Sequence, residues 1–207
     1  MTVADLFRYD DNSRLFYLHQ FGYDDDVEPS DVCGHQSGEI DTFVRCDYHP
    51  RVIFVDGSCR SNGQYGSRGG YGVWFGPNSS YNVSNPLKSN TRHTNQRAEL
   101  TACLVALNQI EKFHLFNGDS CSNTYIIATD SAYLVNAMTS YVYTWNRNGY
   151  RTSMGTPVEN QDLIRRIDSK LDAMAYGRQD IDVLFWKIDR SENQEADELA
   201  KDGADRV

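Results

Sequence analysis

The sequence has no run of 18 apolar residues, so it predicts no helix that spans a membrane. Residues 1–23 also lack the basic start and the long apolar stretch of a secretory signal, and they are too acidic for an Arg-rich transit peptide. Cysteines are few, odd in number and widely spread, which argues against a disulfide framework. They are Cys33, Cys46, Cys59, Cys103 and Cys121. These absences together predict an intracellular protein with reduced thiols and no membrane partner.

An excess of positive charge is also missing. The chain has 20 Lys and Arg residues against 29 Asp and Glu residues, a formal net charge of −9. The imbalance is local, because residues 1–50 hold 3 basic and 11 acidic side chains whereas residues 51–207 hold 17 and 18. Proteins that bind nucleic acids are usually basic, because neutralising phosphates releases counterions. The near-neutral second part does not exclude such a ligand, but it predicts weaker binding than a basic relative would show.

The residue pattern divides the chain near residue 51. Residues 1–50 have no clear periodicity, and we expect an acidic extension that is partly ordered, with a short helix near residues 3–9. Residues 51–207 alternate short apolar runs with amphipathic stretches, which is typical of an α/β domain. We expect strands at 52–55, 70–75, 81–83, 125–129 and 181–185, helices at 95–112, 131–138 and 161–174, and a last helix opened by a capping box at 191–194. The fold class predicted is α/β, with a central five-stranded mixed sheet and flanking helices.

Four carboxylates, each in its own short motif, are the most informative residues present. Asp56 and Asp130 end the apolar runs Val-Ile-Phe-Val-Asp and Tyr-Ile-Ile-Ala-Thr-Asp. Glu99 and Asp197 lie inside expected helices, in Asn-Gln-Arg-Ala-Glu and Asn-Gln-Glu-Ala-Asp. Ligands of open α/β sheets gather at the carboxyl ends of strands. If the two strands are parallel neighbours, all four acids can converge there.

Carboxylates that converge favour a particular chemistry. Like charges at close range destabilise one another unless a cation neutralises them. Oxygen ligands alone select Mg²⁺ or Mn²⁺ over zinc, and two such ions about 4 Å apart can hydrolyse a phosphodiester. The alternative is that the acids are ordinary helix caps or surface charges, which is harder to sustain for all four together than for Asp197 alone.

The four motifs, in this order, resemble ribonuclease H of type 1 over roughly residues 51–205. The resemblance implies the ribonuclease H-like fold, with a five-stranded mixed sheet flanked by helices. It also implies an endonuclease that cuts the RNA strand of RNA–DNA hybrids and leaves 5′-phosphate and 3′-hydroxyl ends. The family's catalytic, metal-binding acids match Asp56, Glu99, Asp130 and Asp197. The segment at residues 76–82 is similar to fungal members.

The resemblance also implies substrate contacts. Positions matching the family's first loop, which touches the minor groove of the hybrid, are Gly57, Ser58 and Asn62. Positions matching the binding of a DNA phosphate are Arg92, Thr94 and Asn160, and those matching RNA contacts are Asn95 and Gln96. A guanidinium, a hydroxyl and an amide suit a group of phosphate oxygens. The alternatives are helix capping for Thr94 and Asn95 and an exposed loop charge for Arg92.

The segment at residues 139–163, which we call the handle, resembles a basic element that grips the DNA strand in the family. Its aromatic side chains are retained, and Tyr141 and Trp145 are candidates for contact with the hybrid. Tyr150 is at least as well explained as a core residue. Only Arg147 and Arg151 remain of the positive charge, which again predicts weak binding.

A catalytic-loop histidine, present in many members, is missing here. The segment at residues 186–193 has no histidine, and it resembles members that place an arginine before the asparagine. Arg190 is therefore a candidate for phosphate contact near the metals, or else a surface charge at the start of the last helix. The departure puts the turnover rate in doubt more than the activity.

The function predicted is hydrolysis of the RNA strand of RNA–DNA hybrids by a monomer that uses Mg²⁺, with Mn²⁺ as a second possibility. One alternative is a nucleic-acid-binding domain of this fold with little or no activity. Another is a nuclease that also cuts double-stranded RNA. A separate zinc site is a weaker hypothesis than unrelated residues in a loop-rich extension, and its ligands would be Cys33, His35, Cys46 and His49.

Overall fold

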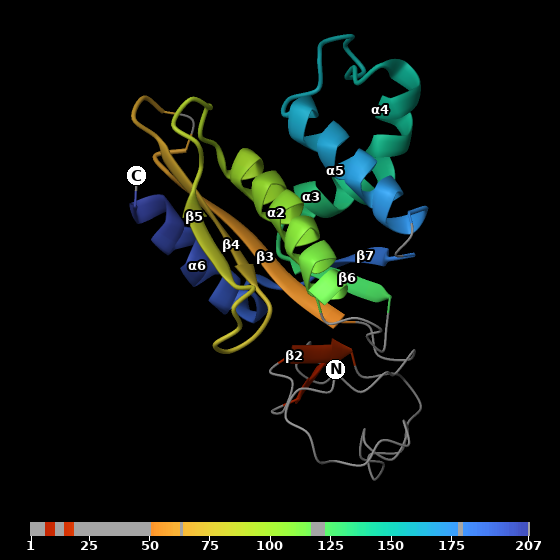
Figure 1. Ribbon diagram of the computed structural model, residues 1–207. Helices are drawn as coiled ribbons and strands as arrows, with labels where there is room; N and C mark the ends of the chain where they lie inside the picture. Colours follow the sequence, from red (N-terminus) through yellow and green to blue (C-terminus); the bar gives the residue numbers. More distant parts are fainter. Residues whose placement is uncertain are drawn as a thin grey trace.

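The computed structural model shows a twisted sheet with helices on both faces (Figure 1). It describes residues 7–10, 15–18, 51–62, 64–116, 123–177 and 180–206. The predicted zinc ligands at residues 33–49 lie outside the described residues. In the part of the chain that the structure describes, no helix is both long and apolar enough to cross a bilayer.

Five strands form the sheet that the sequence predicts. They are β3 (Arg51–Arg60), β4 (Arg68–Trp74), β5 (Val83–Pro86), β6 (Thr124–Thr129) and β7 (Asp182–Lys187). Strands β3, β4 and β5 are antiparallel neighbours, whereas β6 pairs in parallel with both β3 and β7. The spatial order is therefore β5-β4-β3-β6-β7, and β3 lies at its centre. Strand β3 is long and its first six residues are buried, so it is a rigid support for whatever follows on it.

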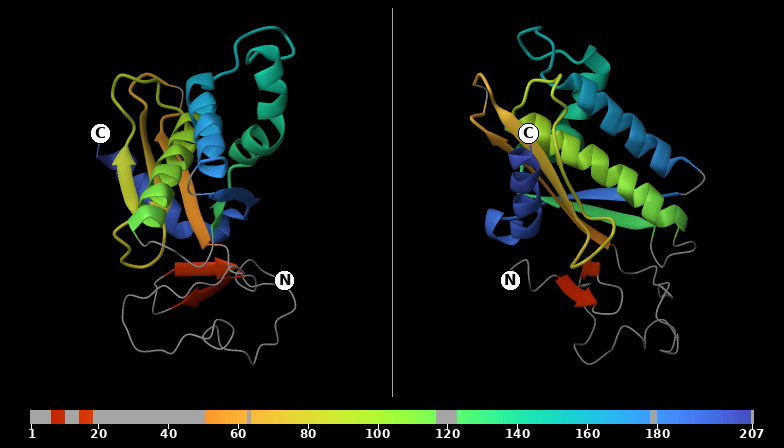
Figure 2. Two further views of the ribbon diagram at one scale, coloured as in Figure 1. Left: turned by 45° about the vertical axis from the view of Figure 1, so that its right-hand side comes forward. Right: turned by 60° about the vertical axis from the view of Figure 1, so that its left-hand side comes forward.

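The helices form two layers. Helices α2 (Asn95–Phe116) and α5 (Gln161–Ala175) cover one face, and α6 (Gln194–Asp205) covers the other (Figure 2). The larger apolar core lies between the sheet and α2, and it includes Ile53, Leu107 and Ile127, all fully buried. Between β6 and α5 the chain forms α3 (Ala132–Asn136), the π-helical turn η2 (Ala137–Tyr141) and α4 (Val142–Asn148), so the helix expected at 131–138 is only the first part of a longer helical segment.

The N-terminal extension differs from the prediction. Two short strands, β1 (Phe7–Asp10) and β2 (Leu15–Leu18), pair with each other, and β2 pairs with the start of β3 through Phe16 and Val52. Over the described residues, these two strands extend the predicted five-stranded sheet to seven strands. The helix expected near residues 3–9 is wrong for Phe7–Asp10, because β2 supplies the backbone hydrogen-bond partners that so short a helix cannot supply to itself.

Two local predictions also need correction. The third strand of the domain is β5 at Val83–Pro86 rather than 81–83, because the Asn82 side chain accepts a hydrogen bond from the Phe75 backbone N–H (2.7 Å) and closes a turn over those residues. The capping box is wrong as well. Residues Arg190–Glu192 form a 3₁₀ turn, η3, and α6 begins after Asn193, whose side chain makes no capping hydrogen bond.

Candidate functional site

Asp56 and Asp130 lie side by side on parallel strands. The register of β3 and β6 pairs Phe54 with Ala128, so two residues further on it brings Asp56 level with Asp130. Asp56 is buried, with 7% of its surface exposed, and Asp130 follows directly after β6. This placement is what the strand-end argument requires.

Glu99 reaches the same place because Gly57 lets helix and strand approach closely. A Cβ on Gly57 would overlap the backbone nitrogen of Glu99 and the backbone carbon of Ala98. Any larger residue at this position would push α2 away from β3. Gly57 therefore sets the distance between the acid on β3 and the acid on α2, in addition to any substrate contact.

Asp197 approaches from the opposite face of the sheet, in the first turn of α6. Its two carboxylate oxygens are held by different cations. Arg190 donates from Nη2 to Oδ1 at 3.0 Å, and Lys201, one helical turn later, forms an ion pair with Oδ2. Arg190 is 73% exposed and Asp197 only 15%, so the arginine folds over the acid from the solvent side.

Electrostatics show that the four acids influence one another. Burial, followed by repulsion from Asp130, raises the pKa of Asp56 from 3.8 to about 8, and Asp197 and Glu99 add weaker repulsion. Burial also raises the pKa of Glu99 from 4.5 to about 7, with repulsion from Asp130 acting in the same direction and a hydrogen bond from Ser131 opposing it. Acids that repel one another from four separate elements form one site, and that site stores unfavourable charge that a cation can relieve.

Two residues that hold these acids were missed from the sequence. Asn193 is 1% exposed, and its Nδ2 donates both to the Val55 carbonyl and to Oδ1 of Asp130, each at 3.0 Å. Ser131 caps α3 by accepting from the Leu134 backbone N–H, and its hydroxyl donates to Glu99. The small residue after Asp130 was the available signal for Ser131. The sequence patterns around Asn193 were the capping box and an arginine before the asparagine, and neither predicts that its side chain is buried.

The site is not a ready-made cation cage. Among the described residues, no group of three or more His, Cys, Asp or Glu side chains is arranged to hold an ion. Asp197 is held by Arg190 and Lys201, and Glu99 by Ser131. The donor chemistry suits a hard divalent cation, which would compete with Arg190 and Lys201 for the charge of Asp197.

The expected minor-groove and RNA contacts are joined by a direct hydrogen bond. Oδ1 of Asn62, at the end of β3, accepts from the Asn95 backbone N–H at 3.1 Å. Thr94 caps α2, because its hydroxyl oxygen accepts from the Arg97 backbone N–H at 3.2 Å. Asn95 and Gln96 are exposed and Ser58 is half-buried. The two loops therefore form one polar surface at the start of α2.

The expected phosphate contacts lie next to this surface. Arg92 is 71% exposed and forms a long ion pair, 3.7 Å, with Glu159. Asn160 has a left-handed backbone (φ 58°), and its Oδ1 accepts from Arg97, which also forms a bidentate pair with Asp162. The Asn160 Nδ2 is buried and, among the described residues, forms no hydrogen bond within the usual limits of distance and angle. The Asn160 side chain nevertheless lies near the Tyr133 hydroxyl. The Oδ1 of Asn160 is thus held by Arg97, whereas its Nδ2 remains able to donate a hydrogen bond.

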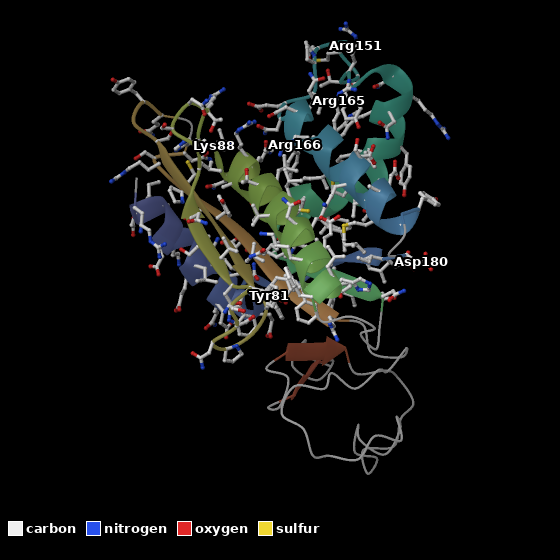
Figure 3. All side chains as sticks on the ribbon, in the orientation of Figure 1. Tyr81, Lys88, Arg151, Arg165, Arg166 and Asp180 are labelled. Atoms are coloured by element: carbon white, nitrogen blue, oxygen red, sulfur yellow. The ribbon has the colours of Figure 1, made fainter. Side chains whose placement is uncertain are left out.

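The handle is structured but exposes few basic side chains. Tyr141 and Trp145 lie 5.5 Å apart between ring centroids, and Tyr141 is 47% exposed. Tyr150 is a core residue, 2% exposed, with the Arg165 guanidinium stacked 3.8 Å over its ring. Arg151 donates to the Gly155 carbonyl at 2.7 Å and so braces the loop (Figure 3). Of the two handle aromatics expected to meet substrate, Tyr141 is the more accessible.

Comparisons with known proteins find similar sequences over the domain that carries this site. The family model for RNase H matches residues 49–205. Ribonuclease H1 of Rattus norvegicus is 34% identical over 157 residues, which is 74% of this chain and 50% of the relative. Ribonuclease H of Schizosaccharomyces pombe is 30% identical over 197 residues, 95% of this chain and 67% of the relative. Ribonuclease H of Neisseria meningitidis is 31% identical over 157 residues, 75% and 95%. This chain thus spans about half the length of the mammalian relatives that it matches.

Solved structures show the same fold. The solution structure of the PFV RNase H domain has a TM-score of 0.54 and 21% identity, and the match covers 75% of this chain and 94% of that one. The crystal structure of LC11-RNase H1 in complex with an RNA/DNA hybrid has a TM-score of 0.51 and 21% identity, covering 75% and 96%. At this identity the likeness concerns the fold alone.

Proposed function

This chain belongs to the ribonuclease H family, and on that premise we propose that it hydrolyses the RNA strand of RNA–DNA hybrids with divalent metal ions. The observation that carries the proposal is the convergence of Asp56, Glu99, Asp130 and Asp197, with the pKa of Asp56 raised to about 8 and that of Glu99 to about 7. A structural role does not explain a buried carboxyl, Asp56, and a half-buried one, Glu99, that are repelled by their neighbours. A cation-binding role does, because metal binding removes the repulsion.

The chain's own residues fit two hard cations. Asp56 and Asp130, side by side at the ends of parallel strands, would hold the ions together with Glu99 and Asp197. When bound, such ions activate a water and stabilise the leaving oxygen of a phosphodiester. The oxygen-only donor set favours Mg²⁺, with Mn²⁺ as an alternative.

Neighbouring side chains would hold the acids in the conformations that bind the ions. Asn193 fixes the rotamer of Asp130 from a buried position, and Ser131 fixes that of Glu99. If Asp197 held an ion, the exposed Arg190 guanidinium would be available for a phosphate oxygen of the substrate. In the absence of the catalytic-loop histidine, Arg190 would make this phosphate contact.

Hybrid recognition would use the polar surface at the start of α2. The loops joined by Asn62 and Asn95 are placed to meet the 2′-hydroxyl groups that mark an RNA strand. Arg92, Thr94 and Asn160 would hold a phosphate of the DNA strand. The solved hybrid complex of LC11-RNase H1, a protein of the same fold, supports the assignment of this ligand class.

A cleavage assay tests the proposal. Labelled RNA–DNA hybrid, double-stranded RNA and double-stranded DNA are incubated with the full chain in Mg²⁺, in Mn²⁺ and in excess EDTA. We expect cleavage of the hybrid RNA strand with either metal, with 5′-phosphate products, and none in EDTA. Cleavage that persists in EDTA would rule out the metal mechanism, and comparable cutting of double-stranded RNA would show a broader nuclease.

One observation favours a second candidate, a hybrid-binding domain with little activity. Asp197 is already neutralised by two cations, and the handle offers only Arg147 and Arg151. Such a domain would bind hybrid in the same assay but leave it uncut in both metals. Measuring binding and cleavage in parallel therefore separates the two candidates.

The phosphate assignment makes a separate prediction for Arg92. The Arg92→Gln variant should bind hybrid roughly threefold to tenfold more weakly, because one charge-assisted phosphate contact is lost. The slope of log affinity against log salt should fall by about one. Fluorescence anisotropy across a salt series measures both.

Lys112→Gln is the matched control for Arg92→Gln. Lys112 is exposed towards the far end of α2, and its substitution makes the same change in net charge. Equal loss of affinity in both variants would mean that Arg92 acts only through overall charge and makes no phosphate contact.

A further inference from the structure

A buried histidine lies in the middle of the expected phosphate-binding segment. His93 stands between Arg92 and Thr94 and is only 5% exposed. The Gly69 backbone N–H donates to its Nδ1 at 2.9 Å, and its Nε2 lies 3.0 Å from the Lys88 carbonyl oxygen. A backbone N–H can only donate and a carbonyl can only accept, so Nδ1 is unprotonated and Nε2 carries the hydrogen. The ring is therefore neutral and in one tautomer.

The two hydrogen bonds of the His93 ring attach the residues before α2 to a strand and to a turn. Gly69 belongs to β4, so the ring fastens the segment to the sheet. The Lys88 carbonyl also accepts from the Thr91 backbone N–H (3.1 Å) and hydroxyl (2.8 Å), so the turn closes around one oxygen. The Ser67 hydroxyl adds a bond to the His93 carbonyl at 3.1 Å. The His93 ring thus adds a second link between the start of β4 and the turn at residues 88–91, beside the hydrogen bond from the Leu87 backbone N–H to the Gly69 carbonyl (2.7 Å).

The other end of the segment is fastened independently. The backbone N–H of Asn95 is held by Asn62, and the Thr94 hydroxyl caps α2. Thr94 therefore sits between an anchor on β4, made by His93, and an anchor on the turn after β3, made by Asn95, and Arg92 directly precedes the first anchor. Lys88, whose carbonyl takes part in the His93 anchor, is labelled in Figure 3 to the left of the start of α2. Loosening either anchor frees the segment that presents both phosphate contacts.

We propose that His93 is a positioning residue for hybrid binding, and that its neutral ring holds Arg92 and Thr94 in the geometry that a DNA phosphate requires. The inference rests on the proposed function. It does not make His93 a substitute for the missing catalytic-loop histidine, because both ring nitrogens are already bonded within the protein. His93 thus acts on affinity and leaves the chemical step to the four acids.

Two substitutions test the role of the ring. His93→Ala removes both bonds and leaves the buried Gly69 N–H without its acceptor. We expect KM for hybrid to rise about tenfold with kcat within twofold of wild type, since one such loss corresponds to about a factor of ten. His93→Gln offers an amide acceptor and donor in place of the two ring nitrogens, and should bring KM back to within about threefold of wild type. Anisotropy in Ca²⁺ should give the same ranking of Kd values without turnover.

His114→Ala is the control for a purely structural effect. His114 lies in the last turn of α2, and its ring has a hydrogen bond with the Tyr125 hydroxyl at 3.3 Å. We expect this variant to lose thermal stability with KM unchanged. If His93→Ala lowers Tm but leaves KM and Kd at wild-type values, or if His93→Gln binds no better than His93→Ala, the positioning role is wrong. If wild-type protein itself binds no hybrid, the proposed function fails and the role of His93 fails with it.

Discussion

The Asp130→Asn variant should lose hybrid cleavage by about 10³-fold or more, because it removes one of the four charges that would hold the proposed ions. A loss of this size corresponds to about 4 kcal/mol of transition-state stabilisation. The fold should remain intact, since the asparagine Oδ1 can still accept the hydrogen bond that Asn193 donates at this position. Single-turnover cleavage in saturating Mg²⁺ measures the loss, and circular dichroism measures the fold.

Asp202→Asn provides the matched control for this prediction. Asp202 is exposed on α6, the helix that carries Asp197, so the same chemical change is made away from the site. Its cleavage rate should remain within twofold of wild type. Wild-type cleavage by Asp130→Asn in Mg²⁺ would show that the two-metal assignment is wrong.

The placement of Asp56 and Asp130 was accessible from the sequence because it depends on local patterns. Each acid follows an apolar run of strand length, and parallel neighbours end at the same edge of a sheet. The same local logic located α2 and α5, whose apolar faces repeat at helical spacing. Where a single helix or strand determines the position of a residue, the sequence of that helix or strand was sufficient to predict it.

The position of Asn193 was not accessible in this way. The pattern at residues 191–194 satisfies the local rule for a capping box. The Asn193 side chain turns inwards instead, because the Val55 carbonyl and the Asp130 carboxylate both need a buried donor. Those two acceptors lie on β3 and just after β6, far away in sequence. Tertiary demand outweighed a local preference worth about 1 kcal/mol.

Strands β1 and β2 were not predicted for the same reason, and neither was the ion pair between Arg190 and Asp197. The sequence of the extension has no periodicity, and β2 becomes part of the sheet only through pairing with β3. Likewise, Arg190 reaches Asp197 because the η3 turn brings it to the start of α6, whereas Lys201 pairs with Asp197 one turn along the same helix. The pairing of β2 and the contact of Arg190 arise between elements, which a single sequence does not specify.

Removing the charge of Asp56 should stabilise the metal-free protein, and more so as pH rises. Burial favours the neutral carboxyl and raises its pKa from 3.8 to about 8. Between these values the unfolded chain is ionised while the folded chain retains the proton, so the free energy of unfolding falls as pH increases. The stability associated with the neutral Asp56 is fully present below about pH 4 and lost as pH rises through 8. Glu99 acts in the same direction between about pH 4.5 and 7.

The Asp56→Asn variant has no charge to bury at any pH. It therefore does not lose the stability that the wild type loses as Asp56 ionises, which is larger than the loss due to Glu99. In EDTA at pH 8 its free energy of unfolding should exceed that of wild type by about 2–4 kcal/mol, on a scale of 1.36 kcal/mol per pKa unit, and the gap should shrink towards pH 5. Thermal melts at both pH values measure it, with Asp202→Asn expected to follow wild type. Mg²⁺ should narrow the gap at pH 8, because a bound cation relieves in the wild type the same repulsion that the substitution removes. An Asp56→Asn protein that is less stable than wild type at pH 8 would mean that Asp56 stabilises the fold as an ion, and that the four acids are not the strained cation site proposed here.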